Sequence, residues 1–202
     1  SLIRLLLSIA TDDAMAAVER SGRTPLHFAV CYCDDDTVTA VVLSYPDAVI
    51  VRDGNGGTPL DWAVSKNRSL DIIRRFEVAS HVTEIQDGTN NAIINGDVVQ
   101  AIELSTVLVD YDSSNPDYYF LRSTAHLIGG NIASALADVN SCLALNPRYL
   151  QALTRKGCLL HAVKKYDDAI SIFEKGLVKY PNSEDLAAGL DQSIRAKATE
   201  LK

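Results

Sequence analysis

Two adjacent cations, Arg155 and Lys156, lie in the stretch LQALTRKG (150–157), whose other residues have the character of a buried helix. Cations in such a place can stabilise a reacting anion, bind the carboxylate of a partner, or keep one helix face solvated. A catalytic use requires a base, a nucleophile or a metal site nearby. The other polar residues of the chain therefore decide between these uses.

The four histidines do not indicate a hydrolase. His27, His81, His126 and His161 are spread along the chain, and none is grouped with a nucleophile and an acid as a catalytic triad requires. The aspartate run DDD at 34–36 is more typical of an exposed helix start, where the helix dipole favours acids, than of a metal site. The sequence therefore predicts no enzyme and no metal site.

The segment DGNGG (53–57) superficially resembles a phosphate-binding or calcium-binding loop. A phosphate loop needs a following Lys and Ser or Thr, and a calcium loop of the EF-hand type needs Glu at the position of Val64. A tight turn explains these glycines better, because such turns need positive φ angles. We therefore expect no cofactor.

The cysteines Cys31, Cys33, Cys142 and Cys158 each lie in an apolar, helix-like context. No two of them form a CxxC pair, and no histidine lies at the spacing of a zinc ligand. We therefore expect reduced thiols in the core of a cytoplasmic protein, with the nucleus as the alternative compartment.

The composition indicates a soluble globular protein, because 47% of the 202 residues are hydrophobic and 22% are charged. The net charge of −7 disfavours nucleic acid as the main partner, since phosphate contacts need clustered Lys and Arg. Arg4 interrupts the opening LIRLLLSIA, and no apolar run approaches the ~20 residues of a membrane span, so we expect no membrane insertion. The chain starts without Met, and we interpret it as a piece of a longer protein.

The elements that carry these residues repeat along the chain. RTPLHFAV (23–30) returns as GTPLDWAV (57–64), and Thr24 and Thr58 are 34 residues apart. Pro is tolerated in the first turn of a helix, and the Thr before it can cap that turn. Each motif therefore predicts the start of a helix with one buried face.

These motifs resemble the start of the ankyrin repeat, which pairs two antiparallel helices. The resemblance implies ankyrin repeats over residues 1–80, with the second helix of a truncated repeat at 1–10, a full repeat at 22–54 and a closing repeat at 55–80. In this family the motif histidine, here His27, joins neighbouring loops by hydrogen bonds. The second motif has Asp in its place, so we expect those bonds to differ there.

The second half of the chain carries a different set of matching positions. Ala101, Ala135 and Ala169 are spaced by 34 residues, and so are Pro147 and Pro181. Small residues allow paired helices to approach closely, and each Pro ends a repeat. The stretch KKYDDAISIFEKGLVKYP resembles the second helix of a tetratricopeptide repeat (TPR) and the turn after it.

This resemblance implies a TPR domain over residues 81–202. Its parts are three repeats at 82–115, 116–149 and 150–183, and a capping helix at 184–200. The predicted fold is all-α, a helical-hairpin solenoid in which ankyrin repeats are followed by a TPR superhelix.

Three TPRs with a cap resemble the peptide-binding modules of heat-shock organising co-chaperones, whose first helices line a groove for a chaperone tail. In that group five polar residues form a clamp for the terminal carboxylates. At these positions the chain has Gln86, Asn90, Leu121, Gln151 and Arg155. Only Asn90 and Arg155 match the clamp. Neutral Gln replaces both of its lysines, which predicts weaker binding of a doubly charged tail.

The aromatic run YYF at 118–120 adds a candidate contact, because consecutive helical residues point to different faces. We expect Tyr119 to fill the space between repeats. The other two rings then either cover the linker, or Tyr118 or Phe120 contacts a bound peptide. In the same phase Arg155 faces the groove, whereas Lys156 points about 100° away around the helix and is solvated.

The leading hypothesis is a non-catalytic adaptor or scaffold that binds a protein or peptide partner in the TPR groove. A second partner on the ankyrin surface is a further option. Two alternatives stay open. One is a co-chaperone that binds chaperone C-terminal tails through the reduced clamp, and the other is the regulatory arm of a larger enzyme.

Overall fold

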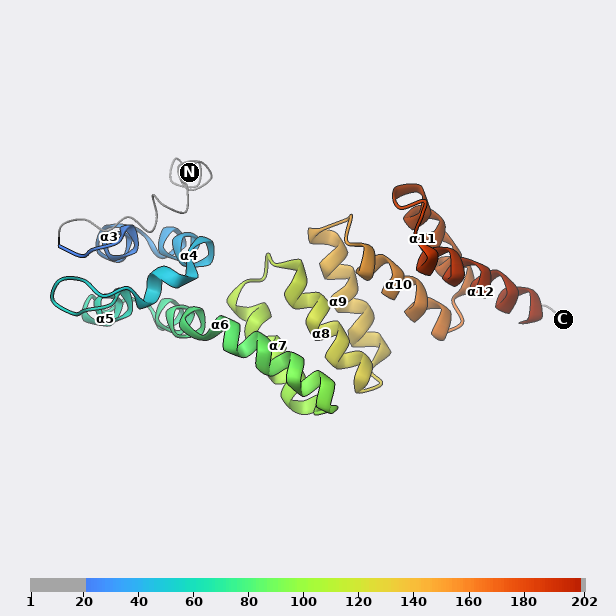
Figure 1. The fold of residues 1–202 in the computed structure, drawn as a ribbon, viewed down its shortest axis with the longest axis horizontal. Coiled ribbons are helices and arrows are strands. Elements are labelled where there is room, and N and C mark those ends of the chain that lie inside the picture. Colours follow the sequence, from blue (N-terminus) through green and yellow to red (C-terminus); the bar gives the residue numbers. More distant parts are fainter. Residues whose placement is uncertain (1–20, 201–202) are drawn as a thin grey trace. The chain divides into compact units, whose positions relative to one another are not determined.

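The computed structural model describes residues 21–200, and the helix predicted at 1–10 lies outside them. The described residues form helices and connecting turns without any strand, so the all-helical prediction is confirmed for them (Figure 1). None of these described helices is long and apolar enough to cross a membrane. The chain divides into two compact units, residues 1–84 and 85–202, and helix α6 (Leu70–Asn95) contributes residues to both.

The first unit is built from short helices. Its described elements are α3 (Pro25–Tyr32), α4 (Asp35–Ser44), the 3-10 helix η1 (Pro46–Ile50), α5 (Pro59–Ser65) and the beginning of α6. Thr24 and Thr58 precede α3 and α5 with extended backbone, and a Pro opens each helix, as the two motifs predict. Helix α3 packs against both α4 and α5, which buries Leu26 and Val30 completely or nearly so.

The two helix starts use different side chains. The backbone N–H of Thr24 donates to Nδ1 of His27 at 3.0 Å. On its other side, Nε2 of His27 lies 3.2 Å from the carbonyl oxygen of Gly57, which links α3 to the turn before α5. At the second start the backbone N–H of Thr58 donates to the carboxylate of Asp61 at 2.8 Å. Asp61 therefore caps the start of α5, as His27 does for α3. Of these two side chains, His27 is the one that also bonds to the neighbouring turn.

Two acidic segments of the first unit have structural uses. Asp53 accepts from the backbone N–H groups of Asn55 and Gly57, each at 2.9 Å, which closes a tight turn over DGNGG. Asp34 accepts from the backbone N–H of Thr37 at 2.8 Å and so caps the start of α4. Both predictions, a turn and a helix start, are confirmed.

The second unit is a series of longer helices. They are the end of α6, α7 (Val98–Tyr111), α8 (Pro116–Ile128), α9 (Ile132–Leu145), α10 (Leu150–Ala162), α11 (Tyr166–Lys179) and α12 (Glu184–Glu200). From α7 to α12 each helix packs against the next one in the chain (Figure 1). The repeated alanines Ala101, Ala135 and Ala169 are at most 1% exposed, which lets paired helices approach closely.

A phenyl ring joins the last three helices. Phe173 on α11 is fully buried, and it contacts Gly157 on α10 and Gly189 on α12. A Cβ atom at either glycine would lie 2.4 Å from a ring carbon, far inside van der Waals contact. Leu186 of α12 is also fully buried in this cluster. Helix α12 therefore completes the core of the second unit as well as covering its end.

The cysteines correct one prediction. Cys142 is a buried core thiol, as expected, and burial raises its pKa to about 11. Cys31 and Cys33 are only partly buried, and Cys158 is exposed. The expectation of four core thiols is therefore wrong for Cys158. Its apolar neighbours in sequence lie on other faces of α10, since a helix turns 100° per residue.

Candidate functional site

Helix α8 offers three oxygen acceptors to Arg155 from one face, because Phe120, Ser123 and Thr124 are spaced by three and four residues. Nη1 of Arg155, on α10, donates to the carbonyl oxygen of Phe120 at 3.1 Å. It also donates to the hydroxyl oxygens of Ser123 at 2.8 Å and Thr124 at 2.6 Å. The guanidinium carbon lies 3.9 Å from the centre of the Phe120 ring. The side chain is thus held in one position against α8.

Two nitrogens of Arg155 have no partner within the described part of the chain. Nε and Nη2 make no hydrogen bond there, and neither is among the buried polar atoms that solvent cannot reach. No carboxylate among residues 21–200 pairs with this guanidinium. Burial lowers the pKa of Arg155, because the loss of hydration outweighs the opposing effects of Tyr149, Cys142 and Cys158. Arginine still stays charged at neutral pH, so the site presents a half-buried cation whose counter-charge must come from elsewhere.

Arg122 on α8 shows what a satisfied guanidinium looks like in the same unit. Its Nε and Nη2 donate to the two carboxylate oxygens of Asp138 on α9, at 3.0 and 2.7 Å. The Asp138 side chain is 7% exposed, so this is a largely buried, side-on, bidentate pair. The hydrogen bond that Arg122 donates to Asp138 raises the pKa of Arg122. Arg122 therefore ties α8 to α9, and its side-on edge is not free for a ligand.

A second aromatic ring packs on Phe120, the ring that contacts Arg155. Tyr149, immediately before α10, stacks on Phe120 with ring centres 5.1 Å apart. The Tyr149 hydroxyl donates to a carboxylate oxygen of Asp117 at 2.6 Å. The sequence reasoning missed Tyr149, and its aromatic character at the start of a repeat was the only available signal. Together these contacts fix the position of the Phe120 ring, on which the Arg155 guanidinium packs.

The other predicted site residues lie on the first helices of the expected repeats. Gln86 and Asn90 are one turn apart on α6, and they are half-buried and exposed respectively. Leu121 is half-buried on α8, beside the residues that bind Arg155. Gln151 is exposed on α10, one turn before Arg155. Their joint use as one binding surface stays a prediction.

Tyr118 requires a correction. Its side chain is 6% exposed, and burial raises its pKa. A ring enclosed in this way cannot contact a peptide on the surface, so its assignment to the site is wrong. Phe120 is the aromatic residue that lies against Arg155. Because all three rings of the run occupy a helix, only the packing of α8 on its neighbours could decide which one is covered.

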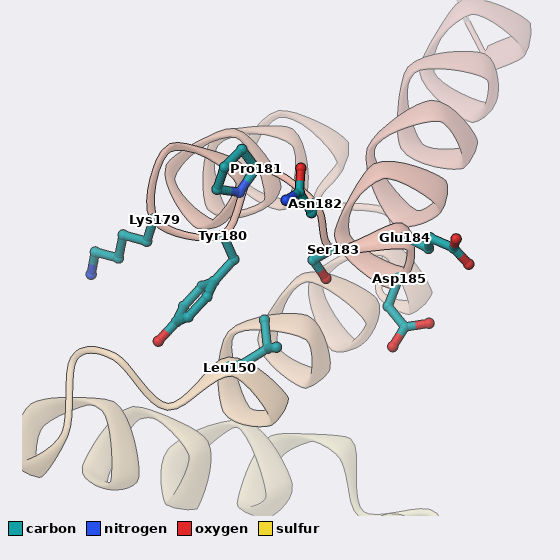
Figure 2. A pocket seen from close by; sticks show the side chains of 8 residues that line it. All are labelled: Leu150, Lys179, Tyr180, Pro181, Asn182, Ser183, Glu184 and Asp185. Atoms are coloured by element: carbon teal, nitrogen blue, oxygen red, sulfur yellow. The ribbon is translucent and has the colours of Figure 1, made fainter.

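An open pocket of about 550 Å³ lies apart from Arg155, where the ends of α10, α11 and α12 meet. Figure 2 shows its lining residues, which are Leu150, Lys179, Tyr180, Pro181, Asn182, Ser183, Glu184 and Asp185. Lys179 and Tyr180 already donate to the backbone carbonyls of Pro147 and Arg148. These polar groups therefore tie α11 to the turn before α10.

No family model matches the chain. Among curated proteins, Hsp70-Hsp90 organizing protein 2 of Arabidopsis thaliana is 27% identical over 95 residues, which are 47% of this chain and 17% of that protein. The SGT1 homolog of Bos taurus is 31% identical over 108 residues, which are 54% of this chain and 32% of that protein. The chain thus covers less than a third of the length of either relative.

Solved structures agree with these relatives. The first TPR of Spaghetti (RPAP3), bound to the HSP90 peptide SRMEEVD, is 28% identical with a TM-score of 0.54, over 57% of this chain and 92% of that one. The Sgt2 TPR domain of Aspergillus fumigatus has a TM-score of 0.55 over 59% of this chain and 80% of that one, and at 24% identity it shows the fold alone. The chain therefore contains a TPR-type helical solenoid that resembles co-chaperone TPR modules. The ankyrin assignment of the first unit stays a prediction.

Proposed function

We propose that this chain is a non-catalytic interaction adaptor whose TPR domain binds an extended peptide over the first helices of its repeats. The observation that carries the proposal is the half-buried guanidinium of Arg155, anchored on α8 and without a carboxylate partner in the described chain. Removing a charge from water is costly unless an opposite charge compensates it. A carboxylate supplied by a partner would provide that compensation.

The first unit supports a second interaction surface. Equivalent capped helix starts recur at Thr24 and Thr58, and His27 bonds to the turn that precedes the next helix. The backbone N–H of Gly54 also donates to the carbonyl of Ser21 at 2.7 Å, which joins one turn to the next. Stacked helix-pair units of this kind are typical of repeat proteins, whose extended faces bind partners. We assign residues 22–80 to ankyrin-type repeats on this basis.

A co-chaperone role is the more specific version of the proposal. The relatives include an Hsp70-Hsp90 organizing protein, and the RPAP3 structure holds an HSP90 peptide. Against a strong clamp of the same kind stand Gln86, Leu121 and Gln151, which supply no positive charge. We therefore favour an acidic peptide as ligand and treat the chaperone tail as the first peptide to test.

The test is a calorimetric titration of SRMEEVD into the whole chain and into two single variants. Arg155→Ala removes the proposed anchor, and Lys156→Ala removes the neighbouring cation on the same helix. One charge-assisted contact is worth about 1.5–3 kcal/mol, so Arg155→Ala should weaken binding by about tenfold or more. Lys156→Ala should leave the Kd within about twofold, because its side chain leaves α10 in a direction about 100° away from Arg155. Equal affinities for all three proteins would contradict the assignment of Arg155.

A further inference from the structure

The unbonded side of the Arg155 guanidinium has room for the two oxygens of one carboxylate. Its Nη1 is already taken by three oxygens of α8. Nε and Nη2 are left, and together they form the side-on edge of the guanidinium, with two parallel N–H donors. This edge matches the two oxygens of one carboxylate. The chain itself shows the match, since Arg122 holds Asp138 through the same two nitrogens at 3.0 and 2.7 Å.

Few cations accompany Arg155 on the helices that carry the site. Helix α6 from residue 85 to its end has neither Lys nor Arg, and the side-on edge of Arg122, the one arginine of α8, is occupied by Asp138. On α10 the remaining Lys or Arg is Lys156, which follows Arg155 and leaves the helix in a direction about 100° away. A second carboxylate bound beside the first would therefore meet no ammonium that points in the same direction as Arg155.

One acidic group lies close to the ring that contacts Arg155. Asp117 accepts a hydrogen bond from Tyr149, whose ring stacks on the Phe120 ring next to the guanidinium. Its negative charge disfavours a second anion near Arg155.

Resting on the proposed peptide-binding function, we propose that Arg155 selects a peptide segment that carries one isolated carboxylate flanked by uncharged side chains. The preferred ligand therefore differs from a chain end with terminal Asp, which brings two carboxylates together. Leu121, which follows Phe120 in the chain, is half-buried and carries no charge. The carboxylate comes either from the end of the main chain or from an acidic side chain, and the test separates these two sources.

Four matched heptapeptides measure this preference on the whole chain. SRMQQVN carries only the terminal carboxylate, and SRMQQVD amide carries only the side-chain carboxylate. SRMQQVD carries both, and SRMQQVN amide carries neither. We expect at least one of the two peptides with one carboxylate to bind as tightly as the peptide with two carboxylates or tighter. The peptide without a carboxylate should bind about tenfold more weakly than the better peptide with one.

Two variants connect the preference to geometry. Arg155→Lys keeps the charge and loses the side-on edge of the guanidinium. It should therefore bind the better of the two peptides with one carboxylate about tenfold more weakly. Lys156→Ala should keep the order of the four peptides. If the peptide with two carboxylates binds more than fivefold tighter than both peptides with one carboxylate, the inference is overturned and the adaptor function is left standing. No binding of any of the four, nor of SRMEEVD, would overturn both.

Discussion

Arg122 and Arg155 lie in the same unit, and each fastens helix α8 to a neighbour. Arg122 ties α8 to α9 by giving its side-on edge to Asp138, and this hydrogen bond raises its pKa. Arg155 ties α10 to α8 through Nη1 alone, and burial lowers its pKa. The Arg122 guanidinium thus has a carboxylate partner, whereas the Arg155 guanidinium has none in the described part of the chain. The comparison distinguishes an arginine that serves the fold from one that is available to a ligand.

The largest expected effect comes from breaking the complete pair. Asp138→Ala leaves the Arg122 guanidinium, 21% exposed, without its carboxylate. Loss of one partner from a largely buried ion pair costs about 3 kcal/mol of unfolding free energy. Urea denaturation followed by circular dichroism measures this loss. The double variant Arg122→Met with Asp138→Leu should recover most of it, because neither the guanidinium nor the carboxylate of the pair is then left in the protein. A loss below 1 kcal/mol in Asp138→Ala would end the contrast between the two arginines.

The corresponding change at the incomplete site should cost much less stability. Arg155→Met removes three hydrogen bonds of one nitrogen but leaves no carboxylate unpaired in the described chain, and its thioether can still pack on Phe120. We expect a loss of about 1 kcal/mol in the same denaturation experiment. A loss as large as that of Asp138→Ala would show that Arg155 serves mainly to hold the fold.

The anchoring of Arg155 can be tested without touching its charge. Thr124→Val replaces the hydroxyl that accepts from Nη1 at 2.6 Å by a methyl group of similar size. Since one hydrogen bond is worth about 1 kcal/mol, peptide affinity should fall by about fivefold. Ser134→Ala on α9 is the matched control, because its side chain is remote from Arg155 in the chain and should leave the Kd unchanged. Unchanged binding in Thr124→Val would mean that the position of the guanidinium does not depend on α8.

The smallest effect concerns the exposed thiol beside the site. Burial raises the pKa of Cys158, so at pH 8 a smaller fraction is thiolate than for an ordinary cysteine, and alkylation should accelerate as the pH rises towards the raised pKa. A bound peptide should slow alkylation of Cys158 by about twofold or more at fixed pH, since the thiol is one turn from Arg155. Peptide mapping by mass spectrometry measures the rate. Buried Cys142, with its pKa raised to about 11, is the internal control and should react more slowly in both states.

Several features could be predicted because they depend on residues close together in the chain. Pro after Thr24 or Thr58 marks a helix start through local capping and a fixed φ angle. The turn over DGNGG follows from the Asp53 carboxylate and the backbone N–H groups just after it. Small residues at a fixed spacing indicate closely packed helix pairs, and Ala135 is buried accordingly.

The candidate site could be predicted only in part. The repeat phase predicted that Arg155 lies on a first helix and faces the groove, but it did not reveal that Phe120, Ser123 and Thr124 hold one nitrogen of the guanidinium. It also assigned Tyr118 to the surface, where the structure buries that ring. These contacts join residues that lie about one repeat apart, and helical periodicity alone does not determine how two helices are rotated against each other.

The amino-acid sequence by itself determined that this chain is a repeat protein made of helices, because capping and periodic burial act over three or four residues. It also determined that Arg122 is the one Lys or Arg between residues 81 and 147. Only the tertiary structure decided that Arg122 is satisfied by Asp138 and that Arg155 keeps a free edge. The physical reason is that ion pairing and burial depend on which side chains neighbouring helices bring together, and that is settled by packing between helices.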